Sequence, residues 1–172
     1  MAVKTFSPEA VTVVISTGDI NHIVSGYAEG TMISLEPNSQ RSTPYYGAQG
    51  TASRAMNPVR AYTMTVTLAQ TSHSNDVLNY ILENDQRNWD GTFVCTVKDA
   101  SGTTIYNDEF AYITDEPTVS FSGGGSIESR EWMIELPEPS GVTGGNGRFS
   151  SDEQLQVERL GGSVSSKWSS AD

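Results

Sequence analysis

Polar and apolar side chains alternate most clearly over residues 59–70. The apolar positions in this run alternate with Thr63, Thr65 and Thr67, and a period of two residues predicts a β-strand. One face of such a strand carries aliphatic and aromatic side chains, and the other carries a row of hydroxyls. We therefore expect the apolar face to pack on a core and the threonine face to meet water or a polar cavity.

Residues 126–136 show the same alternation near the end of the hydrophobic part of the chain. Trp132 and Leu136 fall on one face of the predicted strand, and Glu131 and Glu135 fall on the other. The two glutamates are interpreted as part of a polar row that faces solvent or a lumen. The alternative is that they form an acid pair.

Weaker signals of the same kind predict several further strands. They lie at residues 10–16, 21–27, 31–36, 92–99, 103–107 and 109–114. One predicted helix interrupts these strands. A Ser or Asn cap within residues 71–76 and an early Asp76 suit a helix N-terminus. An apolar stripe follows, and residues 84–88 end the helix. The chain is therefore predicted to be mainly β with one α-helix.

Residues 37–58 break the pattern because they contain almost no aliphatic side chains and many turn-forming ones. A structureless loop of this length is unusual in a compact domain and is often functional. The adjacent Tyr45 and Tyr46 indicate that it packs on something. The alternative is a mobile surface loop.

The character of the chain changes again after Pro137. Residues 1–137 are predicted to form a β-domain, and residues 138–172 a Gly/Ser-rich extension. Within the extension, a short helix at residues 151–160 with Ser151 or Asp152 as its cap is expected. We expect this extension to be mobile or to depend on a partner for its order.

Composition agrees with a β-rich domain and adds a strong charge. The 172 residues favour a single domain, and 36% apolar residues with 16 glycines are typical of strands, turns and polar faces. The formal net charge of −11 disfavours ordinary DNA or RNA binding, because phosphates would be repelled. Such a charge serves either solubility alone or a surface past which DNA slides without sticking.

The residues capable of chemistry do not form a recognisable pattern. The single cysteine, Cys95, lies in a predicted strand and is interpreted as a buried thiol, with an intersubunit disulfide as the alternative. His22 and His73 lack metal-ligand spacing, and Asp108 and Glu109 would face opposite sides of a strand. We expect no catalytic, cofactor-binding or metal-ligating residue, although a Ser-His-Asp triad assembled in space stays open.

No apolar run approaches the roughly 18 residues of a membrane span, and the first residues lack the apolar core of a secretory leader. We therefore expect no membrane partner and synthesis in a cytoplasm.

Three stretches of the chain together resemble a known family. They are residues 25–36, residues 47–54 and residues 64–78, and the most specific block is Gln70-x-Ser72-x-Ser74-Asn75-Asp76-Val77-Leu78 after a strand. Residues 96–104 and Arg130-Glu131-Trp132 extend the likeness, which covers roughly residues 9–137. In this order they are similar to the tail tube proteins of contractile-tailed bacteriophages.

The resemblance implies a β-sandwich or half-barrel with one helix, whose strands join a β-barrel lumen across subunits. Six copies would close into a ring, and rings would stack into a hollow tube through which genome DNA is ejected into the host. The chain would lie in the virion tail after synthesis in the host cytoplasm. Its partners would be the tail sheath, tape-measure, baseplate and tail-terminator proteins.

On this hypothesis two sets of residues acquire roles. The lumen-facing set is Thr63, Thr65, Thr67, Glu131 and Glu135. The ring-to-ring contact loop carries Tyr45, Tyr46 and Arg54.

Three alternatives stay open at this point. The first is the tube protein of a bacterial contractile injection or secretion system. The second is a carbohydrate-binding β-sandwich that stacks sugars on Tyr45, Tyr46 and Trp89. The third is a hydrolase that uses Glu131 or Glu135.

Overall fold

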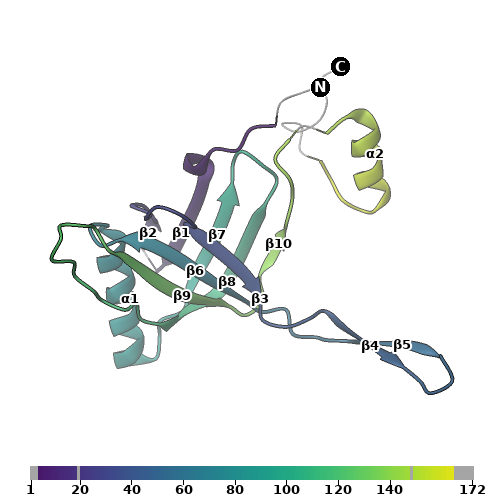
Figure 1. Cartoon of the computed structure of the whole chain (residues 1–172), viewed down its shortest axis with the longest axis horizontal. Helices are drawn as coiled ribbons and strands as arrows, with labels where there is room; N and C mark the ends of the chain where they lie inside the picture. The colour runs from purple at the N-terminus through teal and green to yellow at the C-terminus, as the bar shows by residue number, and fades with distance from the viewer. Residues whose placement is uncertain (1–3, 19, 148, 165–172) are drawn as a thin grey trace.

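The computed structural model describes residues 4–18, 20–147 and 149–164 (Figure 1). Ten strands and two α-helices lie in this part of the chain, preceded by a short 3-10 turn at Pro8–Ala10. The elements are β1 (Val11–Thr17), β2 (Ile20–Ile23), β3 (Ile33–Pro37), β4 (Ser42–Tyr46), β5 (Ala52–Met56), β6 (Tyr62–Ala69), α1 (Ser74–Asn88), β7 (Phe93–Asp99), β8 (Ile105–Asp115), β9 (Ser129–Leu136), β10 (Ser140–Val142) and α2 (Ser151–Arg159). The prediction of a mainly β fold is confirmed.

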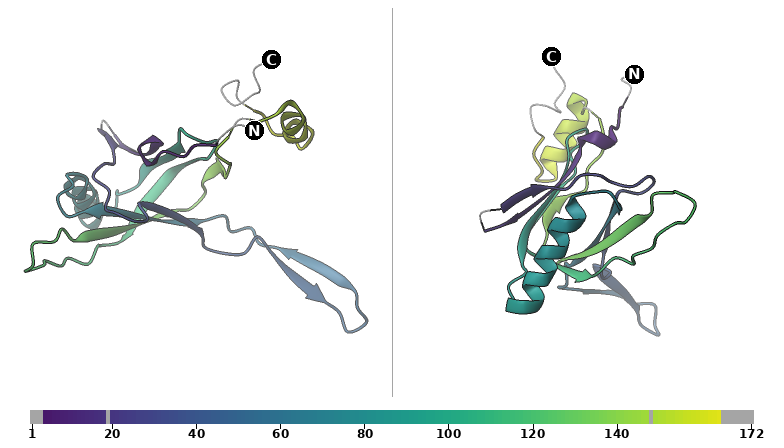
Figure 2. Two further views of the ribbon diagram at one scale, coloured as in Figure 1. Left: turned by 45° about the horizontal axis from the view of Figure 1, so that its top comes forward. Right: turned by 90° about the vertical axis from the view of Figure 1, so that its left-hand side faces the viewer.

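The main sheet is antiparallel, with the strand order β2-β1-β7-β8-β9-β6-β3. Strand β8 belongs to both halves of it, because its first part pairs with β7 and its last part pairs with β9. Figure 2 shows the curved sheet that results from two further sides. The half-barrel description therefore fits the molecule.

The separate strands predicted at residues 103–107 and 109–114 are one strand, so that division was wrong. The register with β7 shifts between the pairs Cys95–Asp108 and Phe93–Ala111, which leaves a bulge at residues 109–110. A bulge bends a strand and increases its twist. It therefore lets β8 pass from one half of the sheet to the other without a turn.

The core fills the concave side of this sheet. Every second residue of β6 and β9 is buried there, as the alternation predicted: Met64, Val66, Leu68, Trp132, Ile134 and Leu136. Helix α1 contributes the fully buried Leu78 to the same cluster.

Helix α1 begins at Ser74, inside the range of residues 71–76 where its start was predicted. The expected Ser or Asn cap was wrong in detail, because the residue in the cap position is His73, whose side chain makes no capping bond. The Ser72 hydroxyl instead accepts the Ser74 N–H at 3.2 Å. The Asn75 side chain is buried and hydrogen-bonds Trp132 in the core.

Residues 37–58 are not a structureless loop, and that interpretation was wrong. Strands β4 and β5 form an antiparallel hairpin in which Tyr45 lies opposite Ser53 and Tyr46 opposite Ala52. Gly50 closes its turn with a φ of +81°, which favours glycine. The hairpin projects from one end of the molecule (Figures 1 and 2).

The chain after Pro137 does not leave the sheet at once. Strand β10 pairs with the first residues of β8, and α2 follows. The cap of α2 is Ser150 in a capping box with Glu153, not Ser151 or Asp152 as predicted. Residues 165–172 of the predicted extension lie outside the described residues, and the domain boundary at residue 137 stays a prediction.

Within the described residues, the structure contains no helix that is both long enough and apolar enough to cross a membrane.

Candidate functional site

The face of β6 and β9 that points away from the core gathers the five residues predicted to share a lumen. Thr63 lies opposite Glu135, and Thr67 lies opposite Glu131. Thr65 lies between them, opposite Met133. Directly opposed residues project from the same face of a sheet, and this face points away from the core. The tertiary pairing therefore brings the whole set together.

Two flanking strands extend this face on both sides. From β3, Glu36 lies opposite Thr63, and from β8, Tyr112 lies opposite Glu135 and Asp115 opposite Met133. We call the outward side of β3, β6, β9 and residues 112–115 of β8 the acidic face. Its carboxylates are Glu36, Asp115, Glu131 and Glu135, and no Lys or Arg occupies an outward position on it.

Sequence reasoning missed Glu36, Tyr112, Met133 and Asp115 as members of this surface. The alternation around Glu36 was visible and could have placed that residue. The β8 residues had no such signal, because the bulge shifts their alternation out of phase.

Hydrogen bonds from Thr63 and Asn38 hold the Glu135 carboxylate of the acidic face in place. The Thr63 hydroxyl lies 2.7 Å from Asn38 Oδ1 and 3.1 Å from Glu135 Oε2. The Asn38 side-chain amide also donates to Glu135 Oε1. This small network links the ends of β3, β6 and β9 on the polar side.

The geometry does not support the interpretation of Glu131 and Glu135 as an acid pair. They are four residues apart on one straight strand, which separates their backbones by about 13 Å. Paired carboxylates of glycoside hydrolases lie about 5–9.5 Å apart. The two glutamates are therefore separate charges on one polar face.

The hairpin residues Tyr45, Tyr46 and Arg54 are all exposed, the tyrosines to 66% and 73%. Successive residues of a strand face opposite ways, so Tyr45 lies on one side of the hairpin, and Tyr46 and Arg54 lie on the other. Trp89 directly follows α1, which lies at the opposite end of the molecule from the hairpin (Figure 1). The three aromatic residues of the carbohydrate hypothesis therefore form no common platform.

The two histidines meet at the start of α1. His22 Nε2 lies 2.8 Å from Ser74 Oγ, and the two imidazole rings are 6.4 Å apart. Burial, and next the nearby His73, lower the pKa of His22. Ser74 is fully buried and also accepts the Ser25 N–H, so its hydroxyl cannot reach a substrate. This serine–histidine contact is structural.

Cys95 is buried in the core, as predicted. Burial, and next the negative charge of Asp108, raise the pKa of the Cys95 thiol to about 12. A thiol in this position cannot reach another subunit, so the intersubunit disulfide is not supported.

Asp108 is a carboxylate with only 2% of its surface exposed, whereas Glu109 is exposed, as the opposite-face prediction required. One Asp108 oxygen accepts the Phe110 N–H and the other accepts the Glu138 N–H, each at 2.8 Å. The first bond stabilises the bulge in β8. The second attaches the chain that leaves β9 to the same point.

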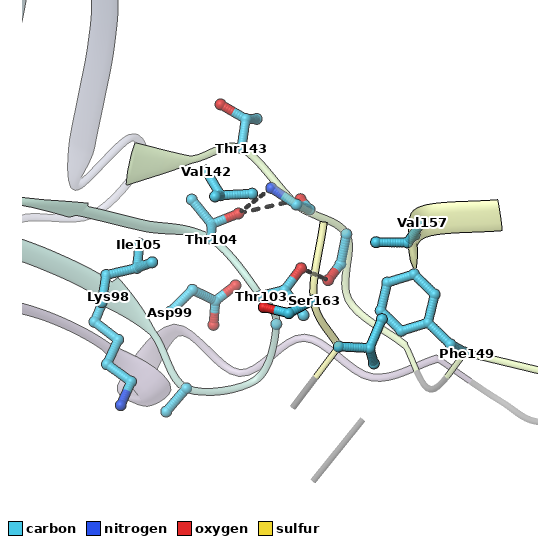
Figure 3. A pocket seen from close by; sticks show the side chains of 15 residues that line it. Lys98, Asp99, Thr103, Thr104, Ile105, Val142, Thr143, Phe149, Val157 and Ser163 are labelled. Atoms are coloured by element: carbon cyan, nitrogen blue, oxygen red, sulfur yellow. Dashed lines mark hydrogen bonds between the residues drawn. The ribbon is translucent and has the colours of Figure 1, made fainter. Parts of the chain in front are cut away.

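A hollow of about 620 Å³ lies between the β7–β8 turn and the C-terminal segment (Figure 3). Its walls include Ile105, Val142 and Phe149, and among the described residues only Lys98 and Asp99 of its lining are titratable. It therefore offers apolar surface without a pair of groups suited to acid–base chemistry.

Asp99 fastens the C-terminal segment beside this hollow. Its carboxylate accepts hydrogen bonds from the Ser101 hydroxyl at 2.6 Å and from the Asn146 side-chain amide at 2.8 Å. Burial opposes ionisation of Asp99, but these bonds outweigh it and lower its pKa. We call this arrangement the Asp99 clamp.

No group of three or more His, Cys, Asp or Glu side chains suited to a metal ion occurs among the described residues.

No model of a known protein family matches the chain. Over 169 residues, which are 96% of both chains, it is 34% identical to Structural protein ORF10 of Pseudomonas phage KPP10. The chain belongs to this family of phage structural proteins. The expected likeness to a phage structural component is thus confirmed.

Solved structures show the same fold at low identity for this phage structural protein. A chain in the baseplate of the anti-feeding prophage aligns with a TM-score of 0.57 and 10% identity, covering 83% of this chain and 97% of that one. A chain in the sheath/tube terminator of the PVC extracellular contractile injection system gives 0.55 and 15%, covering 83% and 100%. A chain in the PVC sheath–tube complex gives 0.54 and 13%, covering 81% and 92%.

Proposed function

We propose that this phage structural protein is the subunit of a contractile tail tube. Six copies close into a ring, and the rings stack into a hollow channel through which genome DNA is ejected. The role is mechanical and electrostatic, without an enzymatic step. The protein lies in the virion tail after its synthesis in the host cytoplasm.

The acidic face carries this proposal. A sheet face opposite the core has to be wetted, and hydroxyls alternating with carboxylates keep it hydrated. Its four carboxylates, with no opposing cation, repel phosphates at short range. A wall of this kind lets DNA pass without binding it. In this proposal Thr63, Thr65, Thr67, Glu131 and Glu135 line the channel.

Free strand edges supply the means of closing the ring. Among the described strands, β3 pairs only with β6, so its other edge is open. Residues 112–115 of β8 pair only with β9. An open edge is a template for another strand, and closure of a barrel removes it. Pairing of these edges between copies would continue the four-stranded wall around the channel.

The β4–β5 hairpin and the C-terminal segment suit contacts outside the ring wall. Tyr45, Tyr46 and Arg54 on the projecting hairpin make the contacts between rings. The C-terminal segment with α2 lies on another side of the molecule, where it decorates the tube or contacts the sheath (Figure 1). The tape-measure protein fills the lumen before DNA does, and the baseplate and tail-terminator proteins bind the two tube ends.

Electron microscopy of the concentrated protein and of the phage particle tests the proposal. We expect six-fold rings or tubes of the purified chain, and labelling along the whole tail by an antibody against it. A protein that stays monomeric at every concentration and is absent from the tail would overturn the proposal.

A second candidate is the tube, cap or baseplate component of a contractile injection system, because the solved structures with this fold come from such particles. The genomic neighbours separate the two candidates: portal and tape-measure genes indicate a phage, and secretion genes a secretion system. The number of copies per particle separates a tube from a cap, since a cap needs only one ring.

A further inference from the structure

The charge of the chain is unevenly distributed. Acidic residues outnumber Lys and Arg by 21 to 10 over the whole sequence. Yet no Asp or Glu occurs between Glu36 and Asp76, and this interval contains Arg41, Arg54 and Arg60. The β4–β5 hairpin is therefore a cationic projection on an anionic protein.

The exposed side chains of the hairpin have no partner among the described residues on either face. All five residues of β5 are exposed, as are Tyr45 and Tyr46 of β4. Arg41 lies over the Tyr62 ring, 5.7 Å from its centre, and so belongs to the base of the hairpin. The Arg54 side chain forms no hydrogen bond or ion pair with any of the described residues. A two-stranded hairpin of this kind is marginal in isolation and gains from docking.

A complementary surface lies where β8 and β9 are connected. A hollow of about 310 Å³ there is lined by Asp115, Glu116, Glu128 and Glu131, and none of the described Lys or Arg residues lines it. None of these carboxylates forms an ion pair within the described part of the chain. Met133 adds an apolar patch to the wall. We call this surface the acidic hollow.

The strand registers place the hairpin and the acidic hollow at opposite ends of one sheet. The hairpin leaves the end where Pro37 pairs with Tyr62. The β8–β9 connection leaves the end where Ala69 pairs with Ser129, roughly 23 Å away along β6. Figure 1 shows the hairpin at the right end of the molecule and the green β8–β9 connection at the left end.

We propose that the hairpin of one copy docks in the acidic hollow of a second copy, with Arg54 against Glu116 and Glu128. This inference rests on the proposed tube, for which it names the two surfaces that join successive rings. Because the surfaces differ and lie at opposite ends, each contact leaves one hairpin and one hollow free. Such a head-to-tail contact does not close on itself and extends along an axis.

The chemistry of the two surfaces supports one occupant, a second copy of this chain. Arginine pairs with carboxylates through a planar fork of donors, and Tyr45 and Tyr46 supply rigid area to cover apolar wall. The pairing of opposite charges at the surface is screened by salt, so stacking should weaken as ionic strength rises.

Charge reversal tests the contact. We expect Arg54→Glu and the pair Glu116→Lys with Glu128→Lys each to raise the subunit concentration needed for tubes by about tenfold or more. Combining all three changes should restore assembly. The matched control is Lys98→Glu, which makes the same charge change on an exposed residue of β7. Sedimentation and electron microscopy measure the tubes, and circular dichroism confirms that each variant folds.

A cross-link keeps the test independent of charge. Ala52→Cys, on the same side of the hairpin as Arg54, combined with Ser120→Cys in the lining of the hollow should give a ladder of disulfide-linked oligomers from assembled tubes, and neither change alone should give it. Tubes of Arg54→Glu at the wild-type concentration, or no ladder from assembled tubes, would overturn the docking while leaving the tube proposal intact. A wild-type chain that never assembles would overturn both.

Discussion

The Trp132 indole N–H donates a hydrogen bond of 3.0 Å to Asn75 Oδ1 in the core. The bond joins β9 to the first turn of α1 across 57 positions of sequence. The Asn75 amide also donates to the Ala69 and Ser72 carbonyls, so one side chain connects the helix, the end of β6 and the partner strand.

Asn75→Ala should therefore lower the free energy of unfolding by roughly 2–4 kcal/mol. It leaves a buried indole N–H without an acceptor and two carbonyls without this donor. Chemical denaturation of the purified subunit measures the loss. Asn79→Ala is the control, because the Asn79 side chain is exposed and bonds only the Glu83 side chain among the described residues. A loss as small as the roughly 0.5 kcal/mol expected of that control would contradict the role of Asn75.

Asp108→Ala should destabilise the fold by roughly 2–4 kcal/mol, because the Phe110 and Glu138 N–H groups lose their acceptor. Asp108→Asn should lie between this variant and the wild type, since its amide can accept only one of the two bonds. Thermal or urea unfolding measures both. Glu109→Ala, one residue along on the exposed side, should change stability by less than about 0.5 kcal/mol.

The Cys95 thiol should be inert in the native protein. Burial raises its pKa to about 12, and only the thiolate reacts quickly with disulfide reagents. A native sample at pH 8 should show negligible reaction with Ellman's reagent, whereas a denatured sample should react fully. Ser120→Cys provides an exposed thiol that should react at once. Rapid labelling of native Cys95 would show that the strand opens.

The Asp99 clamp should respond to acid. Because the folded pKa lies below the ordinary value of 3.8, the stabilisation is complete above that value and is lost as pH falls through the lowered pKa. Protection of the amides of residues 143–147 from hydrogen exchange, measured relative to the intrinsic exchange rate at each pH, should therefore decrease below about pH 4. Asp99→Asn should remove this dependence. An equal loss of protection in both proteins would assign the acid response to other carboxylates.

Replacing both Glu36 and Glu135 by Lys should hinder DNA ejection severalfold while leaving tubes intact, because both lie on the acidic face and neither lines the acidic hollow. The change replaces repulsion of phosphates by attraction on the proposed channel wall. Ejection from phage carrying the variant, followed by dye fluorescence, measures the effect. Glu109→Lys, on an exposed bulge outside that set, is the control. Normal ejection by the double variant would contradict the lumen assignment.

The alternation of apolar and polar residues was sufficient to predict β6, β9 and which of their side chains are buried. It worked because each strand has one face on the core and one in water. The same reasoning failed for the β4–β5 hairpin, since neither of its faces packs on a core and no alternation is required. It also divided β8 in two, because a bulge interrupts the period there.

By itself, the sequence determined a mainly β chain with one well-formed helix, a buried thiol and an acidic surface, because these follow from local periodicity and from charge counts. Only the tertiary structure decided that Thr63 faces Glu135, that Asn75 meets Trp132, and that the cationic hairpin and the acidic hollow lie at opposite ends of one sheet. Those relations depend on strand pairing between distant segments. Local pattern does not encode such pairing, because any register that buries the same face satisfies the alternation equally well.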